Sequence, residues 1–235
     1  MSKLLTTTPK QDGFYLPAET NSHLRTWMMW PHMKDNWQKN AFPAQKIFTL
    51  IAKIISNYEP VQMIVNEENY SRAKKMLGNV NVNLLELNYY DSWARDLGAL
   101  YLVNAHGERR AVSFQFNGWG MSNSPILKEK QFVWDYTIDN QVSIKMAKIS
   151  GVKYYSCPFL VLEGGSIHTD GEGTLYTTEE CLLNPNRNPN LTKAEIEAYL
   201  IQYLNVEKII WIPQGMFNLF KFKNCSISIL IKFCF

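Results

Sequence analysis

Several residue types are missing from the last twenty positions of this 235-residue chain. The stretch 216–235 contains no Gly, Pro, Ala, Asp or Glu and consists almost wholly of Phe, Ile, Leu, Lys, Asn, Ser and Cys. The preceding residues have the mixed composition of a globular enzyme. We therefore expect residues 1–215 to form the folded part. Residues 216–235 are predicted to be an aberrant tail. Their amino-acid composition, rich in Phe, Lys, Asn and Ile, is what A/T-rich DNA gives when it is translated out of frame.

Strong charge and long apolar runs are also absent. The net charge is only +3 and neither Lys nor Arg forms a long run, so the chain lacks the electrostatic signature of a nucleic-acid-binding protein. Lys221, Lys223 and Lys232 interrupt the tail, which leaves less than the roughly 20 apolar residues that a membrane-spanning helix needs. The segment Met1 to Gln11 is polar and does not resemble a secretory signal. These features favour a cytoplasmic protein with a small-molecule partner, and with neither nucleic acid nor membrane as a partner.

The cysteines form no metal or disulfide pattern. The chain has four, and none belongs to a C-x-x-C pair; they are Cys157, Cys181, Cys225 and Cys234. This scatter favours reduced thiols over a disulfide framework or a zinc site. A catalytic thiol needs a neighbouring base or positive charge, but Cys157 has none beside it and Cys181 follows two acids. We expect both to be buried structural thiols.

Apolar periodicity predicts three helices. The first carries one apolar stripe and ends before Pro60; its members are Ile47, Leu50, Ile51, Ile54, Ile55 and Tyr58. The second has its apolar residues at the same kind of spacing and ends near Gly151; they are Ile138, Val142, Met146 and Ile149. The third follows a capping box formed by Thr192 and Glu195, and we expect it to bury one stripe; its members are Ile196, Tyr199, Leu200, Tyr203 and Leu204.

Strands are expected between these helices, together with a short helix at 71–77. The predicted strands lie at 61–65, 80–87, 99–103, 111–116, 152–156, 174–178 and 208–212. In the tail, apolar residues alternate from Ile227 to Phe235 as in a strand that could pair with an exposed sheet edge. Helices alternating with strands indicate an α/β chain assembled from related modules.

Four loops concentrate the residues that form pockets and bind charge. They are 91–98, with two acids, one base and one indole; 116–120; 162–168, where Glu163 precedes two glycines; and 184–189. Each loop alone has an ordinary explanation: Arg95 could belong to a surface ion-pair cluster, and Glu163 could be a solvated acid in a turn. Four such loops on one small chain favour a binding pocket.

The same loops carry a family resemblance. Over roughly Asp12 to Gly215, ordered motifs resemble agmatine deiminase, of the peptidyl-arginine deiminase-like family of guanidine-modifying enzymes; among them are Trp27 to Pro31, Asp91 to Gly98, Phe116 to Gly120, Leu162 to Gly173 and Thr177 to Pro189. The resemblance implies an α/β propeller of five ββαβ modules (a pentein), of which this chain would hold about three. It also implies hydrolysis of agmatine to N-carbamoylputrescine and ammonia through a covalent Cys intermediate. The resemblance further implies that no metal or organic cofactor takes part, and we expect homo-oligomers only if the missing modules are present.

The residues themselves agree with a guanidinium ligand. A guanidinium is a planar cation whose N–H groups pair with carboxylates. We therefore assign Asp96 and Glu163 as catalytic and substrate-binding residues. We expect these two buried acids to have no compensating cation in the empty site. Trp93 is predicted to line the pocket beside the aliphatic part of the substrate, with core packing as the alternative.

Two motifs that the resemblance leads us to expect are absent. The family's proton-transfer histidine lies in Gly-His-x-Asp and its nucleophile follows Gly-Gly-Gly-Asn-Ile-His, and neither motif occurs in this sequence. We therefore expect a C-terminally truncated deiminase that lacks the nucleophile region and is inactive alone. The alternatives are peptidyl-arginine or arginine deimination, a non-catalytic guanidine-binding fragment, and a fragment that misfolds.

Overall fold

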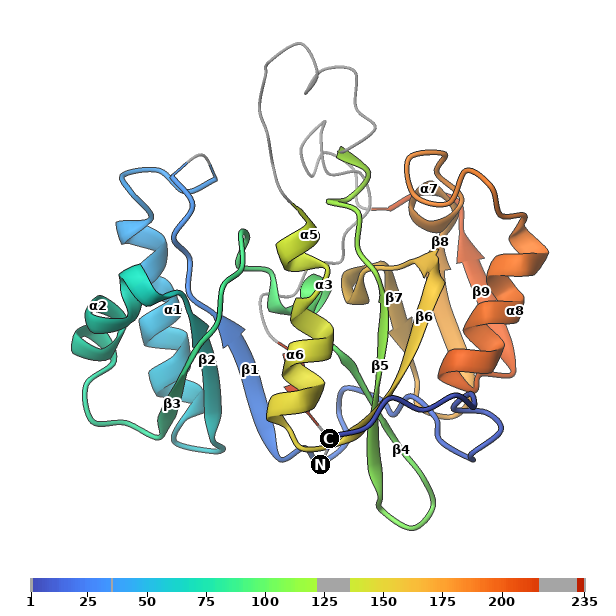
Figure 1. Cartoon of the computed structure of the whole chain (residues 1–235), viewed down its shortest axis with the longest axis horizontal. Coiled ribbons are helices and arrows are strands. Elements are labelled where there is room, and N and C mark those ends of the chain that lie inside the picture. Colours follow the sequence, from blue (N-terminus) through green and yellow to red (C-terminus); the bar gives the residue numbers. More distant parts are fainter. Residues whose placement is uncertain (1, 35, 122–135, 216–231, 235) are drawn as a thin grey trace. The chain divides into compact units, whose positions relative to one another are not determined.

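The computed structural model describes residues 2–34, 36–121, 136–215 and 232–234, and the chain divides into two compact units. Among the described residues, the smaller unit comprises 22–34, 36–95 and 232–234. The larger unit comprises, again among the described residues, 2–21, 96–121 and 136–215. The described strands form three sheets, so the predicted α/β class is confirmed (Figure 1).

The smaller unit is a mostly parallel sheet with two helices. Its strand order is β10-β1-β2-β3, with β1 parallel to β2, β2 parallel to β3, and β10 antiparallel to β1. The elements are β1 (Arg25–Met29), α1 (Phe42–Ile55), β2 (Val61–Val65), α2 (Glu67–Leu77), β3 (Val82–Glu86) and β10 (Lys232–Cys234). All five residues of β2 are buried, as expected for a central parallel strand. The core includes Met28, Trp30, Phe48 and Met63.

The larger unit repeats one strand–strand–helix–strand order. In the first repeat, β4 (Leu100–Val103) and β5 (Arg109–Gln115) are antiparallel, and β6 (Lys153–Val161) returns parallel to β5 after α5 (Tyr136–Asp139) and α6 (Val142–Ile149). Figure 1 shows α6 lying along this sheet, where it contacts β5 and β6.

The second repeat has the same pairing. The strands β7 (Ile167–Thr169) and β8 (Thr174–Thr178) are antiparallel, and β9 (Lys208–Ile212) is parallel to β8. Between them lie α7 (Glu179–Leu182) and α8 (Lys193–Leu204). One hydrophobic cluster joins both repeats, with Leu100, Tyr155, Leu175 and Leu200 among its buried members. The two repeats therefore share a core.

Several predicted elements are confirmed residue for residue. The strands 61–65, 174–178 and 208–212 have the expected bounds. The capping box is present: Thr192 Oγ1 accepts from the Glu195 amide at 3.3 Å, and Glu195 Oε2 accepts from the Thr192 amide at 2.7 Å. Within the predicted stripe of α8, Ile196, Leu200 and Leu204 are buried.

Other predictions need correction. The second predicted helix is two helices, α5 and α6, and the strands β1 and β7 were not expected. Only part of the apolar stripe assigned to α1 faces the core: Ile51 and Ile55 pack against it, whereas Ile47, Leu50 and Ile54 are more than half exposed. The buried positions of the helix include Phe48 and Ala52 instead. The strand predicted in the tail is present at Lys232–Cys234, and the rest of that prediction lies outside the described residues. None of the described helices has the length and hydropathy needed to cross a membrane.

Candidate functional site

The structure brings Asp96 and Glu163 together in the larger unit. Asp96 belongs to the short helix α3 (Ala94–Leu97), and Glu163 directly precedes the 3-10 helix η2 (Gly164–Ser166), which follows β6. The Gly165 amide donates to Oδ1 of Asp96 at 3.0 Å. This hydrogen bond joins the two loops, because Gly165 lies only two residues after Glu163.

Burial excludes the ordinary explanations of these two loops. Asp96 is 4% exposed, Arg95 is 7% exposed and Glu163 is 2% exposed. A surface ion-pair cluster or a solvated acid in a turn would be open to water. A buried carboxylate needs hydrogen-bond donors, and Asp96 has a second one in Trp119 Nε1, which donates to Oδ2 at 3.2 Å. Both acids are therefore held inside the unit in defined orientations.

A protein cation is present at the site, contrary to our expectation of two uncompensated acids. Arg187 Nε donates to Oε1 of Glu163 at 2.7 Å, and both side chains are almost completely buried. The other carboxylate oxygen, Oε2, lies 4.0 Å from the thiol of Cys181. The expectation was wrong because the sequence does not reveal that the loop 184–189 folds back onto Glu163.

Hydrogen bonds link the remaining loops into the same network. Arg187 NH1 donates to Oδ1 of Asn186 at 2.7 Å, and Asn117 Nδ2 donates to the Asn186 carbonyl at 2.9 Å. The Gly120 amide donates to Oδ1 of Asn117 at 2.8 Å. Residues from all four loops singled out in the sequence thus meet in one unit: Asp96 from the first, Asn117 and Gly120 from the second, Glu163 from the third, and Asn186 and Arg187 from the fourth.

Cys157 and Cys181 are both buried and neither belongs to a disulfide, as predicted. Burial raises the pKa of Cys157 to about 11, so the thiol is protonated at neutral pH. The thiol of Cys181 lies 4.0 Å from Oε2 of Glu163. The environment of Cys157 does not activate a nucleophile. The side chains of Cys225 and Cys234 lie outside the described residues.

Trp93 belongs to the smaller unit. Its ring stacks on Trp37, with centroids 5.8 Å apart and an interplanar angle of 27°, and Trp37 meets Phe48 edge to face. Beside it, Asp91 accepts from Asn36 Nδ2 at 2.6 Å. These contacts fit the core-packing alternative, and the role of Trp93 in lining a pocket stays a prediction.

A small pocket opens beside Asp96 in the larger unit. Its lining includes a second buried acid, Asp139. It also includes residues from the sheet and from the helix of the first repeat, among them Leu100, Phe116 and Ser143. In the described part of the chain, no group of three or more His, Cys, Asp or Glu residues has the arrangement of a metal site.

Sequence reasoning missed Arg187 and Trp119 as individual contributors. Both lie in loops that the sequence had marked as unusual, and Arg187 is the sole basic residue of its loop. That isolated charge among Asn and Pro residues was the available signal. Asp139 carried no such signal, because an acid near the start of an amphipathic helix is ordinary.

Comparisons with known proteins identify the family of the chain. The chain belongs to the Porphyromonas-type peptidyl-arginine deiminase family, whose model matches residues 15–234. It is 46% identical over 214 residues to an agmatine deiminase of Ectopseudomonas mendocina, an alignment that covers 91% of this chain and 56% of that protein.

Solved structures give the same result. The agmatine deiminase of Enterococcus faecalis, described as catalysing its reaction, is similar with a TM-score of 0.89 and 36% identity; the match covers 97% of this chain and 60% of that one. The C. jejuni agmatine deiminase with substrate bound matches with a TM-score of 0.70 and 27% identity, over 86% of this chain and 57% of that one. The chain therefore spans somewhat more than half the length of the relatives it matches.

Proposed function

We propose that this chain supplies the guanidinium-binding part of a deiminase whose substrate is agmatine. The observation that carries the proposal is the pair of buried carboxylates, Asp96 and Glu163, which come from separate loops tied together by the Gly165 amide. Carboxylates fixed in this way match the N–H groups of a planar guanidinium. Relatives that are 44% to 46% identical carry the name agmatine deiminase, and this supports agmatine as the proposed substrate.

In the proposed reaction the two acids orient the cation for attack. A thiolate adds to the guanidinium carbon, and one amino group of the adduct accepts a proton and leaves as ammonia. Water then cleaves the amidino-thioether, which gives N-carbamoylputrescine and releases the thiol. Fixing the carbon in front of the sulfur supplies the proximity part of catalysis, which can lower a barrier by several kcal/mol. The reaction as proposed needs no metal or organic cofactor.

The nucleophile of this reaction is not assigned to any described thiol. Cys157 is protonated and Cys181 faces Glu163, so neither is suited to attack. The Gly-His-x-Asp motif that would carry the proton-transfer histidine is also absent from the sequence. We therefore propose that the 235-residue chain binds a guanidine without turning it over.

The proposal also covers the number of modules, the origin of the tail, the cellular location and the oligomeric state. The two ββαβ repeats and the sheet of the smaller unit would be about three modules of a five-module propeller. Residues 216–235 would be an out-of-frame tail. The complete enzyme would be a cytoplasmic homo-oligomer.

Calorimetric titration with agmatine tests the proposal. We expect weak binding by the wild-type chain and at least a tenfold loss of affinity in Asp96→Asn and Glu163→Gln, because each change removes one negative charge that faces the ligand. Glu179→Gln is the matched control, since it removes a carboxylate from an exposed ion pair with Lys193. Binding that is unchanged in both site variants would refute the assignment.

A parallel assay for ammonia separates binding from turnover. We expect no ammonia above the uncatalysed rate with agmatine, free arginine or a peptidyl-arginine substrate. Competition among the three in the titration ranks the ligands, and a preference for arginine or peptidyl-arginine would move the proposal to the corresponding deiminase. Release of ammonia at an enzymatic rate would contradict the proposed lack of turnover.

A further inference from the structure

The candidate site already contains one guanidinium, which the chain itself provides. The Arg187 side chain is 3% exposed and that of Glu163 is 2% exposed, and Nε of Arg187 donates to Oε1 of Glu163 at 2.7 Å. A charged group of this kind is costly to bury unless it is paired, so each of these residues needs the other. The same chemical group that we propose as the ligand therefore occupies one side of Glu163.

The surrounding loops hold Arg187 in this position. Its NH1 group donates to Oδ1 of Asn186 at 2.7 Å, and the Asn186 carbonyl accepts from Asn117. The Arg187 amide donates to the Asn184 carbonyl at 2.8 Å, which fixes the turn that directs the side chain inward. With both its backbone and its guanidinium bonded, Arg187 is a fixed part of the site.

This arrangement limits how Glu163 can bind anything else. With Oε1 bonded to Arg187, the remaining oxygen is Oε2, whose neighbour is the weakly donating thiol of Cys181 at 4.0 Å. Arg187 offsets the charge of one acid of the Asp96–Glu163 pair. A ligand guanidinium bound by this pair would then meet Asp96 and Oε2 of Glu163.

We propose that Arg187 is a positioning residue that fixes the orientation of Glu163 and restricts the site to a single ligand guanidinium. The identity of the ligand rests on the proposed function. The role of Arg187 does not, because removal of its side chain should leave a vacant guanidinium site beside Glu163 in any case.

Chemical rescue of Arg187→Ala with methylguanidinium tests the inference. At millimolar concentrations we expect the thermal midpoint of this variant to rise by several degrees, because the small cation refills the vacated position and binds only the folded chain. The wild-type chain should shift much less. Lys193→Ala is the matched control: it also removes a cation paired to a glutamate, but from an exposed pair, and should not respond.

The double variant Arg187→Ala/Glu163→Gln shows whether the rescue acts through Glu163. We expect it to lose the response to methylguanidinium. If Arg187→Ala is unfolded alone, the folded fraction regained with methylguanidinium, read from near-ultraviolet circular dichroism, replaces the midpoint. A response in Arg187→Ala no larger than in Lys193→Ala, or a folded fraction that does not recover, overturns the proposal.

Binding stoichiometry gives a second readout that loss of stability alone would not produce. With agmatine we expect one site per wild-type chain and two per Arg187→Ala chain. One agmatine per Arg187→Ala chain would contradict the restriction to a single ligand. Failure of the wild-type chain to bind agmatine, with rescue by methylguanidinium intact, would refute the proposed function and leave the role of Arg187 standing.

Discussion

Gly120 and Asn186 pack so closely that the glycine has no room for a side chain. A Cβ atom at Gly120 would lie 2.4 Å from Cγ and 2.7 Å from Nδ2 of Asn186, and the glycine has a φ of +76°. Asn186 in turn accepts from Arg187. The contact between these two loops therefore helps to hold the Arg187–Glu163 pair in place.

We expect Gly120→Ala to lower the free energy of unfolding by about 2–4 kcal/mol, from a strained backbone and a displaced Asn186 together. Urea unfolding monitored by fluorescence measures this change. Gly107→Ala is the matched control, because Gly107 has a φ of +73° but a Cβ atom added there would have no neighbouring atom within 4 Å. It should show the cost of the backbone alone, about 1–2 kcal/mol. Equal losses in the two variants would mean that the contact with Asn186 carries no energy.

Phe48 and Leu50 lie two residues apart on α1 and should differ sharply in their tolerance of substitution. Phe48 is 2% exposed, and we expect Phe48→Ala to cost about 3–5 kcal/mol in unfolding free energy. Leu50 is 54% exposed, so Leu50→Gln should change it by no more than about 0.5 kcal/mol. Denaturant titration of both variants checks the face on which α1 packs. A large loss with Leu50→Gln would support the face that the sequence predicted.

The same helix explains why sequence located the elements better than their buried faces. Strands such as Val61–Val65 are bounded by turn residues and follow from local pattern. In α1 apolar residues occur on nearly every side, so periodicity cannot choose among them. The buried face contains Gln45, whose Nε2 donates to the carbonyl of Pro31, and Thr49, which donates to the carbonyl of Gln45. The Gln45 contact depends on tertiary structure, as does the pairing of Arg187 with Glu163, whereas the Thr49 bond forms within the helix.

Asp12 anchors the N-terminal segment to the sheet of the first repeat. Its Oδ2 accepts from Thr7 at 2.7 Å and from Tyr155 at 2.8 Å, and Arg110 completes an ion pair. Burial raises the pKa of Asp12, but these hydrogen bonds and the charge of Arg110 outweigh it and hold the pKa below its usual 3.8. The carboxylate therefore stabilises the fold above pH 3.8, and this contribution is lost as the pH falls through the lowered value.

We expect Asp12→Asn to cost about 1–3 kcal/mol of unfolding free energy at pH 7 and to reduce the loss of stability in acid. Unfolding in urea at several pH values between neutral and 3 measures both effects. If the variant and the wild-type chain lose stability in parallel down to pH 3, the Asp12 cluster does not contribute to acid unfolding.

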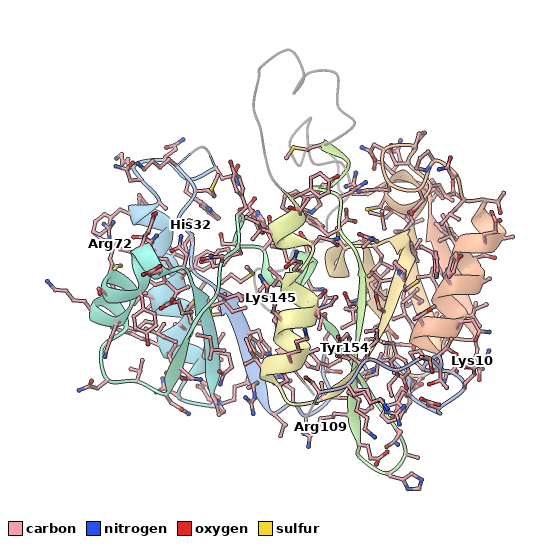
Figure 2. All side chains as sticks on the ribbon, viewed as in Figure 1. Lys10, His32, Arg72, Arg109, Lys145 and Tyr154 are labelled. Carbon is pink, nitrogen blue, oxygen red and sulfur yellow. The ribbon has the colours of Figure 1, made fainter. Side chains whose placement is uncertain are left out.

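His32 should make the smaller unit sensitive to mild acid. The residue lies just beyond the end of β1 (Figure 2), and its ring meets Tyr89 edge to face with centroids 4.9 Å apart. Burial lowers the pKa of His32 below its usual 6.5, although the Trp30 backbone and the charge of Glu68 act in the opposite direction. Because the unfolded chain takes up the proton first, stability is full above pH 6.5 and falls as the pH drops from there towards the lowered pKa.

We therefore expect His32→Gln to reduce the loss of unfolding free energy between pH 7.5 and 5.5. His106→Gln is the control, since His106 is exposed in the turn between β4 and β5. Denaturant titration at the two pH values gives the comparison. An equal loss in wild-type and His32→Gln chains would show that another group controls this pH range.

The thiol of Cys157 should resist alkylation in the folded chain. Its pKa of about 11 leaves roughly one thiolate in a thousand molecules at pH 8, and the side chain is fully buried. We expect iodoacetamide to modify Cys157 and Cys181 only as fast as the fold opens, so that urea accelerates the reaction strongly. Peptide mapping by mass spectrometry resolves each cysteine, and the same peptides in urea serve as the control. Rapid modification of Cys157 in buffer would mean that its thiol is activated, and the assignment of both described thiols to structure would need revision.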